Sequence, residues 1–419
     1  MVILRLALGS LLNRRFTAGL TLGTIALSVC LLLAVERMRN DARESFASTL
    51  SGTDLIVGAR SGEVQLLLYA VFRIGNATNN ISWESYRDIA AHPRVAWTIP
   101  LSLGDSHRGF RVLGTSSDYF RHYRYGRDRA LALAQGRAFE DVYEAVLGWE
   151  VARSLGYRPG QEIVIAHGAG AVSLVEHDDK PFTVVGILAP TATPVDHTVH
   201  ISLEGMTAIH LDWRFGAPLP GMGVSAQRTR EMDLTPRAIT AFLVGLDSRI
   251  ATFALQRMVN DYPEEPLLAV LPGVALNQLW SLVGVAEKAL LLVSSLVVVT
   301  GLLGMLAVIL SGLEERRREM AILRSLGARP WQVFALLLLE AGGLALAGAI
   351  LGCGLLYGLL LLLGPWVEDQ FGLFITIALP GGRELLILAM VVAAGLLMGL
   401  IPGYRAYRNS LADGLTVRI

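Results

Sequence analysis

Four long apolar runs without a charged side chain constrain the fold of this chain more than any other feature. About 20 apolar residues cross the hydrocarbon core of a bilayer, so each run is long enough to span it once. The composition agrees, because 53% of the 419 residues are hydrophobic and the mean hydropathy is +0.49. The four runs cover residues 16–35, 289–313, 341–367 and 385–404.

The placement of arginines orients these spans. Cytoplasmic loops carry an excess of basic residues, so the segments next to arginine clusters are expected on the cytoplasmic side. The expected topology has both termini inside, with residues 36–288 outside. The arginines are Arg5, Arg14 and Arg15 before the first span, five between the second and third, and Arg405, Arg408 and Arg418 after the fourth.

The segment between the first two spans is expected to hold a large mixed α/β domain. Apolar runs bounded by turn residues predict its strands and helices. The candidate strands are Asp54–Gly58, Arg111–Gly114, Glu162–Ala166, Thr183–Leu188, Thr198–Ser202 and Ala241–Leu246. The candidate helices are Trp83–Ala91, Tyr143–Leu155 and Ser248–Tyr262.

Both spans that flank this domain are expected to continue outward as stalk helices. Met38, Ala42, Phe46 and Leu50 keep a four-residue apolar spacing after the first span, and 276–283 shows the same spacing before the second. Such stalks would couple movements of the domain to movements of the spans.

These inferences give one order of segments along the chain. It is an interfacial amphipathic helix at 1–15, a first span at 16–35, a stalk at 36–52, the α/β domain at 53–265, a stalk at 266–288, a second span at 289–313, a cytoplasmic helix at 314–329, a third span at 330–364, an outer loop at 365–384, a fourth span at 385–404 and a tail at 405–419.

The cytoplasmic helix at 314–329 is amphipathic and rich in arginine. Met320 and Leu323 share one face, whereas Arg317 and Arg324, seven residues apart, share another. Gly327 suits a left-handed helix cap, and Pro330 suits the first turn of the next helix. The segment can therefore lie on the membrane and present polar groups to a partner.

Several functions are disfavoured by the sequence. A Walker loop needs lysine after glycine, but Lys180 and Lys288, the only two lysines, follow Asp179 and Glu287. If ATP drives this protein, another chain hydrolyses it. The net charge of zero gives no sign of nucleic-acid binding. Both cysteines lie in spans, so the outer domain is expected to fold without disulfides.

Histidines were weighed as metal ligands, because zinc needs three or four converging donors. We expect no metal site and no catalytic residue, but whether His177, Asp178 and Asp179, or His197 and His200, bind a metal stays open. The other histidines are distant in sequence and are expected to be isolated surface residues: His92, His107, His122, His167 and His210.

Three residues of the third span are candidates for gating or packing. Glu340 lies about 15 Å along the helix that starts at Pro330, where a carboxylate usually faces protein or lies near the membrane boundary. Gly348 and Gly352 belong to a series of glycines that permits close helix packing. Packing between two copies of the chain and packing within one copy both fit this series.

The cytoplasmic segment carries a resemblance to a known family. ERRREMAILRSLGARPWQVFALLLLE, residues 315–340, closely resembles the signature of MacB/FtsX-type (type VII) ABC transporter permeases. Outer-domain runs follow the periplasmic core of that family in the same order. They are RVLGTSSDYF (111–120), QGRAF (135–139), VLGWEVARSLGYRPGQEIVI (146–165) and FTVVGIL (182–188).

This resemblance implies a homodimeric, non-catalytic permease whose loop between spans two and three binds a cytoplasmic ATPase. ATP and magnesium would be bound by that partner, and the stalks would transmit its motion to the periplasm. The chain lacks a fused ATPase domain, and its layout is similar to that of lipoprotein-releasing permeases or of separate-subunit efflux permeases. The implied ATPase-coupling residues are Glu315, Arg316, Arg317, Arg318, Glu319, Met320, Leu323, Arg324 and Gly327.

The resemblance also implies a bacterial inner-membrane location and a role in the periplasm. One expectation is efflux through a periplasmic adaptor and outer-membrane channel, or extraction of a lipoprotein from the membrane. The alternative is ATP-driven signalling, in which the same motion activates a periplasmic enzyme or a sensor without transport. The sequence does not identify the substrate.

Overall fold

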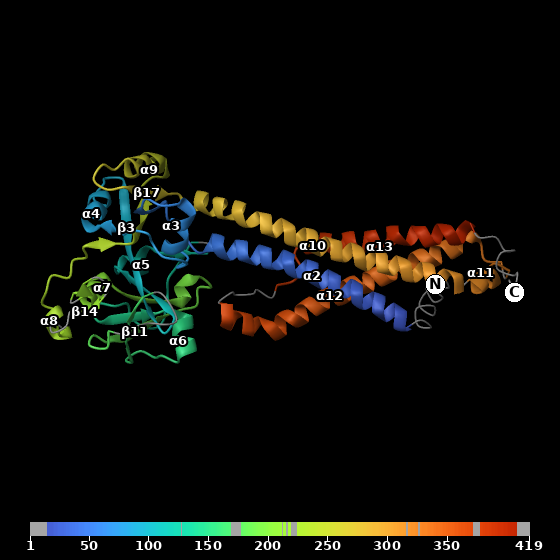
Figure 1. The fold of residues 1–419 in the computed structure, drawn as a ribbon, viewed down its shortest axis with the longest axis horizontal. Coiled ribbons are helices and arrows are strands. Elements are labelled where there is room, and N and C mark those ends of the chain that lie inside the picture. Colours follow the sequence, from blue (N-terminus) through green and yellow to red (C-terminus); the bar gives the residue numbers. More distant parts are fainter. Residues whose placement is uncertain are drawn as a thin grey trace. The chain divides into compact units, whose positions relative to one another are not determined.

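The chain divides into a helical unit, Met1–Ala42 with Gly284–Ile419, and a strand-containing unit, Arg43–Val283, which are described separately here (Figure 1). The computed structural model describes residues 15–126, 128–168, 177–211, 213–214, 217–218, 224–315, 317–325, 327–371 and 378–408. Residues 1–14 of the expected interfacial helix and most of the tail at 405–419 lie outside these residues.

Four helices in the described residues are long and apolar enough to cross a membrane, as the apolar runs predict. Three of them are longer than one span needs. In two of these, most of the segments expected as stalks, 36–52 and 266–288, belong to the same helix as the first or the second span. The stalk expected from residue 266 is wrong at its start, because residues 267–270 form a strand and the helix begins at Pro272. A fifth, short helix, α11, covers Arg317–Ser325. The four long helices are α2 (Arg15–Ser48), α10 (Pro272–Glu315), α12 (Pro330–Phe371) and α13 (Gly382–Arg408).

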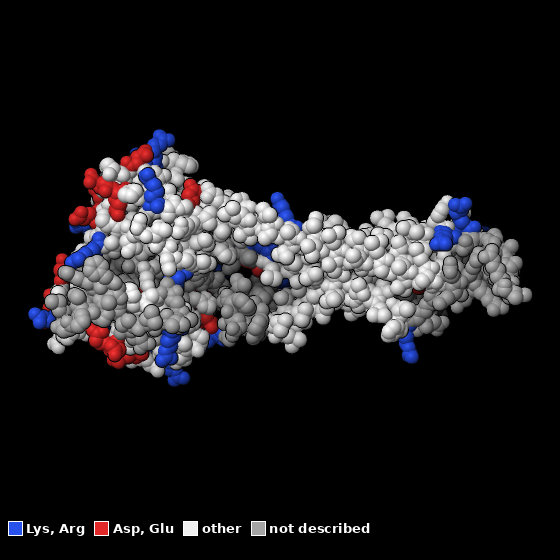
Figure 2. All heavy atoms as spheres, viewed as in Figure 1, with Lys and Arg blue, Asp and Glu red and all other residues white. Residues whose placement is uncertain are grey.

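The helical unit packs around a core of aliphatic side chains. Val29 and Leu33 of α2 meet Met305 of α10 and Leu337 of α12 in this core. The helices α12 and α13 pack against each other, and small residues allow a close approach, with Gly399 against Ala341. The middle of the helical unit shows almost no charged side chains on its surface (Figure 2), as the hydrocarbon core requires.

The strand-containing unit is built on one mixed sheet of eleven strands. Its main path runs β17-β1-β16-β3-β4-β12-β8-β11-β7, while β10 pairs with β3 and β9 with β11. The pairs β4/β12 and β8/β11 are parallel and the others antiparallel. The strands are β1 (Leu55–Ala59), β3 (Val95–His107), β4 (Phe110–Thr115), β7 (Leu133–Gly136), β8 (Glu144–Leu147), β9 (Glu162–Ile163), β10 (Ala166–His167), β11 (Phe182–Leu188), β12 (Thr198–Ser202), β16 (Ala241–Leu246) and β17 (Leu267–Val270).

Short helices cover the sheet and close three apolar cores. The helices are α3 (Glu63–Ala70), α4 (Trp83–Ala90), α5 (Asp118–His122), α6 (Trp149–Leu155), α7 (Leu203–His210), α8 (Ala226–Thr229), α9 (Thr252–Asn260), and the 3-10 turns η1 (Pro194–His197) and η2 (Arg249–Ala251). Two-residue strands pair outside the sheet: β2 (Ile81–Ser82) with β15 (Ala238–Ile239), β5 (Arg124–Tyr125) with β6 (Arg129–Ala130), and β13 (Trp213–Arg214) with β14 (Ala217–Pro218).

The helix predicted at Tyr143–Leu155 is wrong in its first half. Residues 144–147 form the buried strand β8 between β12 and β11, and only the second half is helical. Gly148 separates the two parts, and its amide donates to the carbonyl of Thr198 at 2.9 Å. The run Glu162–Ala166, predicted as one strand, is two short strands, β9 and β10.

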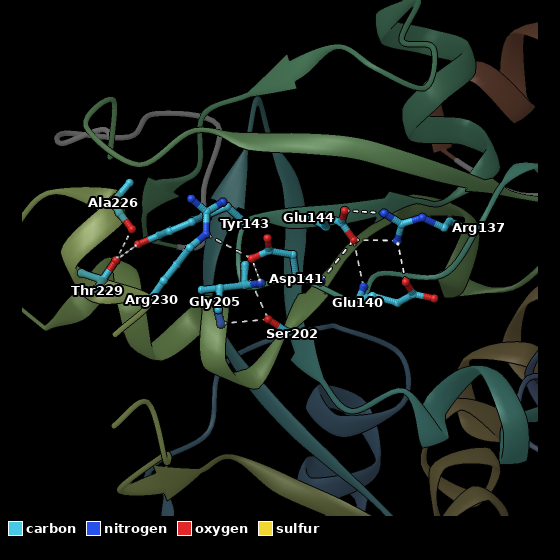
Figure 3. Close-up of polar contacts among 11 residues, drawn as sticks. Arg137, Glu140, Asp141, Tyr143, Glu144, Ser202, Gly205, Ala226, Thr229 and Arg230 are labelled. Atoms are coloured by element: carbon cyan, nitrogen blue, oxygen red, sulfur yellow. Dashed lines mark hydrogen bonds and ion pairs between the residues drawn. The ribbon is translucent and has the colours of Figure 1, made fainter. Parts of the chain in front are cut away.

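A network of charged and hydroxyl groups fixes the segment around β8 (Figure 3). Both oxygens of Glu144 accept from the guanidinium of Arg137, at 2.7 and 2.5 Å, and Glu144 also accepts from the amides of Glu140 and Asp141. These hydrogen bonds, led by that of Arg137, lower the pKa of Glu144 to about 2. The hydroxyls of Tyr143 and Thr229 join the same segment to α8.

We expect Glu144→Gln to lower the thermal unfolding midpoint of the purified protein at pH 7 by about 2–4 °C. Because the folded pKa is below the ordinary value of 4.5, the carboxylate stabilises the fold fully above pH 4.5. The difference between wild type and variant should shrink as the pH falls from 4.5 towards 2. A difference that stays constant over this range would contradict the role of the charge.

Candidate functional site

The predicted coupling segment is helical in its described residues and ends in a turn. The helix α10 ends at Glu315, α11 ends at Ser325, and Gly327 follows with φ +97°. The amide of Gly327 donates to the carbonyl of Arg324 at 3.1 Å, and α12 begins at Pro330. The predicted left-handed cap and the predicted proline start are both confirmed, so the sequence itself determines where α11 and α12 are separated.

The side chains of this segment are only partly described. Met320 is 8% exposed and packs in the core of the helical unit, so it positions α11 and offers little surface to a partner. Ile322 and Ser325 are exposed and Arg324 is half-buried. Arg316 lies outside the described residues, and only the helical backbone is described for Glu315, Arg317, Arg318, Glu319 and Leu323.

The glycines of the third span contact the first span of the same chain. A methyl group on Gly348 would lie 2.5 Å from Cγ2 of Ile25, and one on Gly352 would lie 2.6 Å from the carbonyl oxygen of Ala26. These two glycines therefore allow α12 to pack closely on α2 within one copy. Packing within one copy and packing between two copies were the two alternatives that the sequence allowed. Glu340 is 6% exposed and faces protein.

A polar cluster that the sequence did not single out joins three helices of the helical unit. Arg37 of α2 donates to the hydroxyl of Tyr357 at 3.1 Å and to the carbonyl of Ala378 at 3.0 Å. It also lies 3.6 Å from a carboxylate oxygen of Glu384 at the start of α13. The side chains of Arg37 and Glu384 are 8% and 11% exposed, so this ion pair is buried. In the sequence, the cluster was indicated only by the position of Arg37 and Glu384 next to the ends of two apolar runs.

Four side chains of types that can bind a metal ion lie close together in the strand-containing unit: Asp105, His167, His177 and His210. Asp105 of β3 lies opposite His167 of β10 in an antiparallel pair. The register of β3 against β4 shifts between Leu103 and Ser106, next to Asp105, as at a bulge that redirects a side chain. His210 ends α7.

The distances within this cluster are short. Oδ1 of Asp105 lies 3.1 Å from Nδ1 of His167, and Oδ2 lies 3.4 Å from Nε2 of His210. Those two imidazole nitrogens are 3.2 Å apart. The ring of His177 lies with its centroid 5.3 Å from that of His210. One donor atom from each of the four residues lies within 4.8 Å of all the others.

The electrostatics of the cluster differ from one histidine to the next. Burial lowers the pKa of His210, but the hydrogen bond and charge of Asp105 outweigh burial, so the pKa of His210 is raised. Burial, with the charge of His210, lowers the pKa of His177 to about 4. Burial raises the pKa of Asp105, but its bonds to His167 and His210 prevail and its pKa is lowered.

The expectation of isolated surface histidines is wrong for His167 and His210, which belong to this cluster. His177, expected in a solvated loop, is 1% exposed. Its sequence neighbours Asp178 and Asp179 are exposed and are outside the cluster. No spacing rule could find the site, because its members are spread over 106 residues and meet only through the pairing of β3 with β10.

The other candidate pair, His197 and His200, is not brought together with further ligands in the described residues. His200 is fully buried in β12 between aromatic rings, and Nδ1 lies 3.2 Å from the carbonyl oxygen of Val146. Burial lowers the pKa of His200 to about 3. His197 stacks on Phe110 with ring centroids 6.2 Å apart. Both are packing residues of the domain.

Four spanning helices, a mixed α/β domain after the first of them and a short arginine-rich helix after the second define a membrane permease. A family model described as a MacB-like periplasmic core domain matches residues 17–250, and one described as an FtsX-like permease C-terminal domain matches residues 291–411. The chain belongs to the MacB/FtsX-type ABC transporter permeases, since the first of these matches alone covers more than half of it. The family implies a cytoplasmic ATPase partner.

Solved structures with some likeness to the chain include two extracytoplasmic domains. One is the periplasmic region of MacB from Actinobacillus actinomycetemcomitans, 11% identical over 55% of this chain and 94% of that chain, with a TM-score of 0.34. The other is the extracellular domain of the ABC-type transporter YknZ from Gram-positive bacteria, 13% identical over 52% of this chain and 99% of that chain, with a TM-score of 0.30. No curated protein sequence matches the chain.

Proposed function

We propose that this chain is the membrane subunit of a two-component ABC transporter, in which a separate ATPase binds the segment 314–329. The arginine-rich helix α11, which a turn at Gly327 separates from α12, is the observation that carries this proposal. The sequence offers no Gly-Lys-Ser/Thr step for phosphate binding. ATP and magnesium are therefore bound by the partner, and this chain binds no cofactor for hydrolysis.

Work done on the coupling segment reaches the outer domain through two unbroken helices. Both α2 and α10 contain a span and continue without interruption into residues of the strand-containing unit. Within that unit, Phe46 of α2 contacts Trp280 of α10 edge to face, with ring centroids 5.5 Å apart. The guanidinium of Arg43 lies over the same indole at 5.5 Å. These contacts support mechanotransmission, because they connect the two helix ends to each other.

The proposed location is the bacterial inner membrane, with both termini inside and the strand-containing unit in the periplasm. The arginines next to the spans support this topology. The proposed work is export through an adaptor and outer-membrane channel, or extraction of a lipoprotein, by two copies of the chain. The substrate is handled in the periplasm and does not cross the bilayer between the spans.

Affinity purification of the tagged chain from its native host tests this proposal. We expect a cytoplasmic ATPase to co-purify, and we expect the isolated chain to hydrolyse no ATP until that ATPase is added. ATP hydrolysis by the isolated chain would overturn the two-component reading. An adaptor, channel or lipoprotein among the co-purified proteins supports export, whereas a cell-wall hydrolase or a histidine kinase supports ATP-driven signalling.

A further inference from the structure

The cluster of Asp105, His167, His177 and His210 has the spacing of a metal site. Donor atoms at the corners of a tetrahedron around zinc, with bonds of about 2.0–2.1 Å, lie roughly 3.3–3.4 Å from each other. Oδ1 of Asp105 lies 3.1 Å from His167, Oδ2 of Asp105 lies 3.4 Å from His210, and the facing nitrogens of His167 and His210 are 3.2 Å apart. These spacings match those of zinc ligands, and they link three residues on three different elements of the fold through both oxygens of Asp105.

The tautomer of His210 also fits a ligand. Its Nδ1 lies 2.8 Å from the carbonyl oxygen of Met206, which can only accept, so Nδ1 carries a proton. The lone pair of the neutral ring is then on Nε2, which faces Asp105 and His167. Histidines that bind metals typically donate their second nitrogen to a backbone carbonyl in this way, which fixes the ring.

Backbone contacts hold the remaining ligands in place. His167 faces Asp105 across the β10/β3 pair, and the amide of His177 donates to the carbonyl of Ile165 at 2.8 Å. Asp105 is fully buried, whereas the side chain of His167 is 40% exposed and gives an ion a route from solvent. The site is thus preorganised and reachable, as a metal site must be.

A salt-bridge cluster without a metal ion would explain fewer of the observed contacts. A buried carboxylate paired with two imidazolium rings accounts for Asp105, His167 and His210, but it gives no reason for a third histidine beside them. A metal ion accounts for all four side chains. Three imidazoles and one carboxylate are ligands that suit zinc and other divalent first-row transition ions, and calcium and magnesium prefer oxygen.

We propose that Asp105, His167, His177 and His210 bind one zinc(II) ion in the strand-containing unit. The ion joins β3, β10 and the end of α7, which are distant in sequence, and it does so in a domain that has no cysteine. Four protein ligands leave no open coordination position, so the site is a structural or metal-sensing one and not a catalytic centre.

The test uses the full-length protein in detergent, purified with a tag free of histidine, stripped with a chelator and dialysed against zinc chloride. We expect one zinc per wild-type chain by elemental analysis, and a cobalt(II) absorption of the intensity typical of tetrahedral coordination. His177→Gln and His210→Gln should each lower the affinity for zinc. The loss should exceed the roughly 10–100-fold that removal of an outer-shell partner causes.

Two further variants keep the result interpretable. His167→Gln changes the most exposed of the ligands and disturbs the packing least, so it tests the site if a buried variant does not fold. His92→Gln changes a histidine outside the cluster and should bind zinc as the wild type does. Less than one zinc per wild-type chain, or unchanged affinity in folded ligand variants, would overturn the proposal. The readout is independent of any ATPase.

Discussion

Replacing Arg317 and Arg324 by glutamate should reduce the co-purified ATPase at least about tenfold, which corresponds to 1.4 kcal/mol of binding free energy. The two positions are seven residues apart on α11 and therefore share a face of that helix. Reversing two charges at an interface places like charges against groups that were complementary, and such juxtaposition disrupts docking. The measurement is quantitative immunoblotting of the ATPase after affinity purification of each variant.

A matched control separates docking from membrane insertion. The variant with Arg405→Glu and Arg408→Glu reverses the same number of charges at the end of α13. We expect that end on the same membrane face as α11. Both double variants perturb the basic residues that orient the spans to the same extent. Equal loss of the ATPase from both would show that topology, and not docking, was disturbed. Unaltered co-purification from the α11 variant would count against α11 as the docking site.

Replacing Arg37 by methionine should destabilise the helical unit by about 3–5 kcal/mol, the usual cost of removing one partner of a buried ion pair. The change keeps the aliphatic stem but removes the donors to Tyr357 and Ala378 and leaves the carboxylate of Glu384 buried. Thermal unfolding in detergent, followed by tryptophan fluorescence, measures the loss.

The neighbouring Arg383 provides the control for this variant. Its side chain is 72% exposed, so Arg383→Met should change stability by less than about 0.5 kcal/mol. Combining Arg37→Met with Glu384→Gln should recover part of the stability, since no lone carboxylate then stays buried. Equal effects of the Arg37 and Arg383 variants would refute the buried pair as an anchor.

The sequence predicts an element correctly where the residues of that element alone define it. The strands Thr198–Ser202 and Ala241–Leu246 were predicted with the bounds that the structure has, because short apolar runs between turns define them. The long strand β3 was missed, since Gly104 and Asp105 interrupt its apolar pattern near one end. The helix predicted over β8 failed because β8 is buried on both faces, and a short continuous apolar run has the same pattern in a buried strand and in a helix.

The sites follow the same division. The end of α11 is encoded locally, by Gly327 and Pro330, and sequence reasoning found it. The cluster around Asp105 depends on which strand pairs with β3, and the anchor at Arg37 depends on which helices adjoin α2. Both are properties of tertiary contacts between segments far apart in sequence, and neither leaves a spacing that a single sequence displays.

The unbroken helices α2 and α10 also fix an angular phase between their two ends. Each residue of an α-helix advances by about 100°, so the face that packs among the spans and the face that meets the sheet domain are related by residue count alone. One inserted residue between them would turn one end against the other, whereas seven would nearly restore the original phase. Evolution can therefore lengthen these helices only in steps close to whole turns.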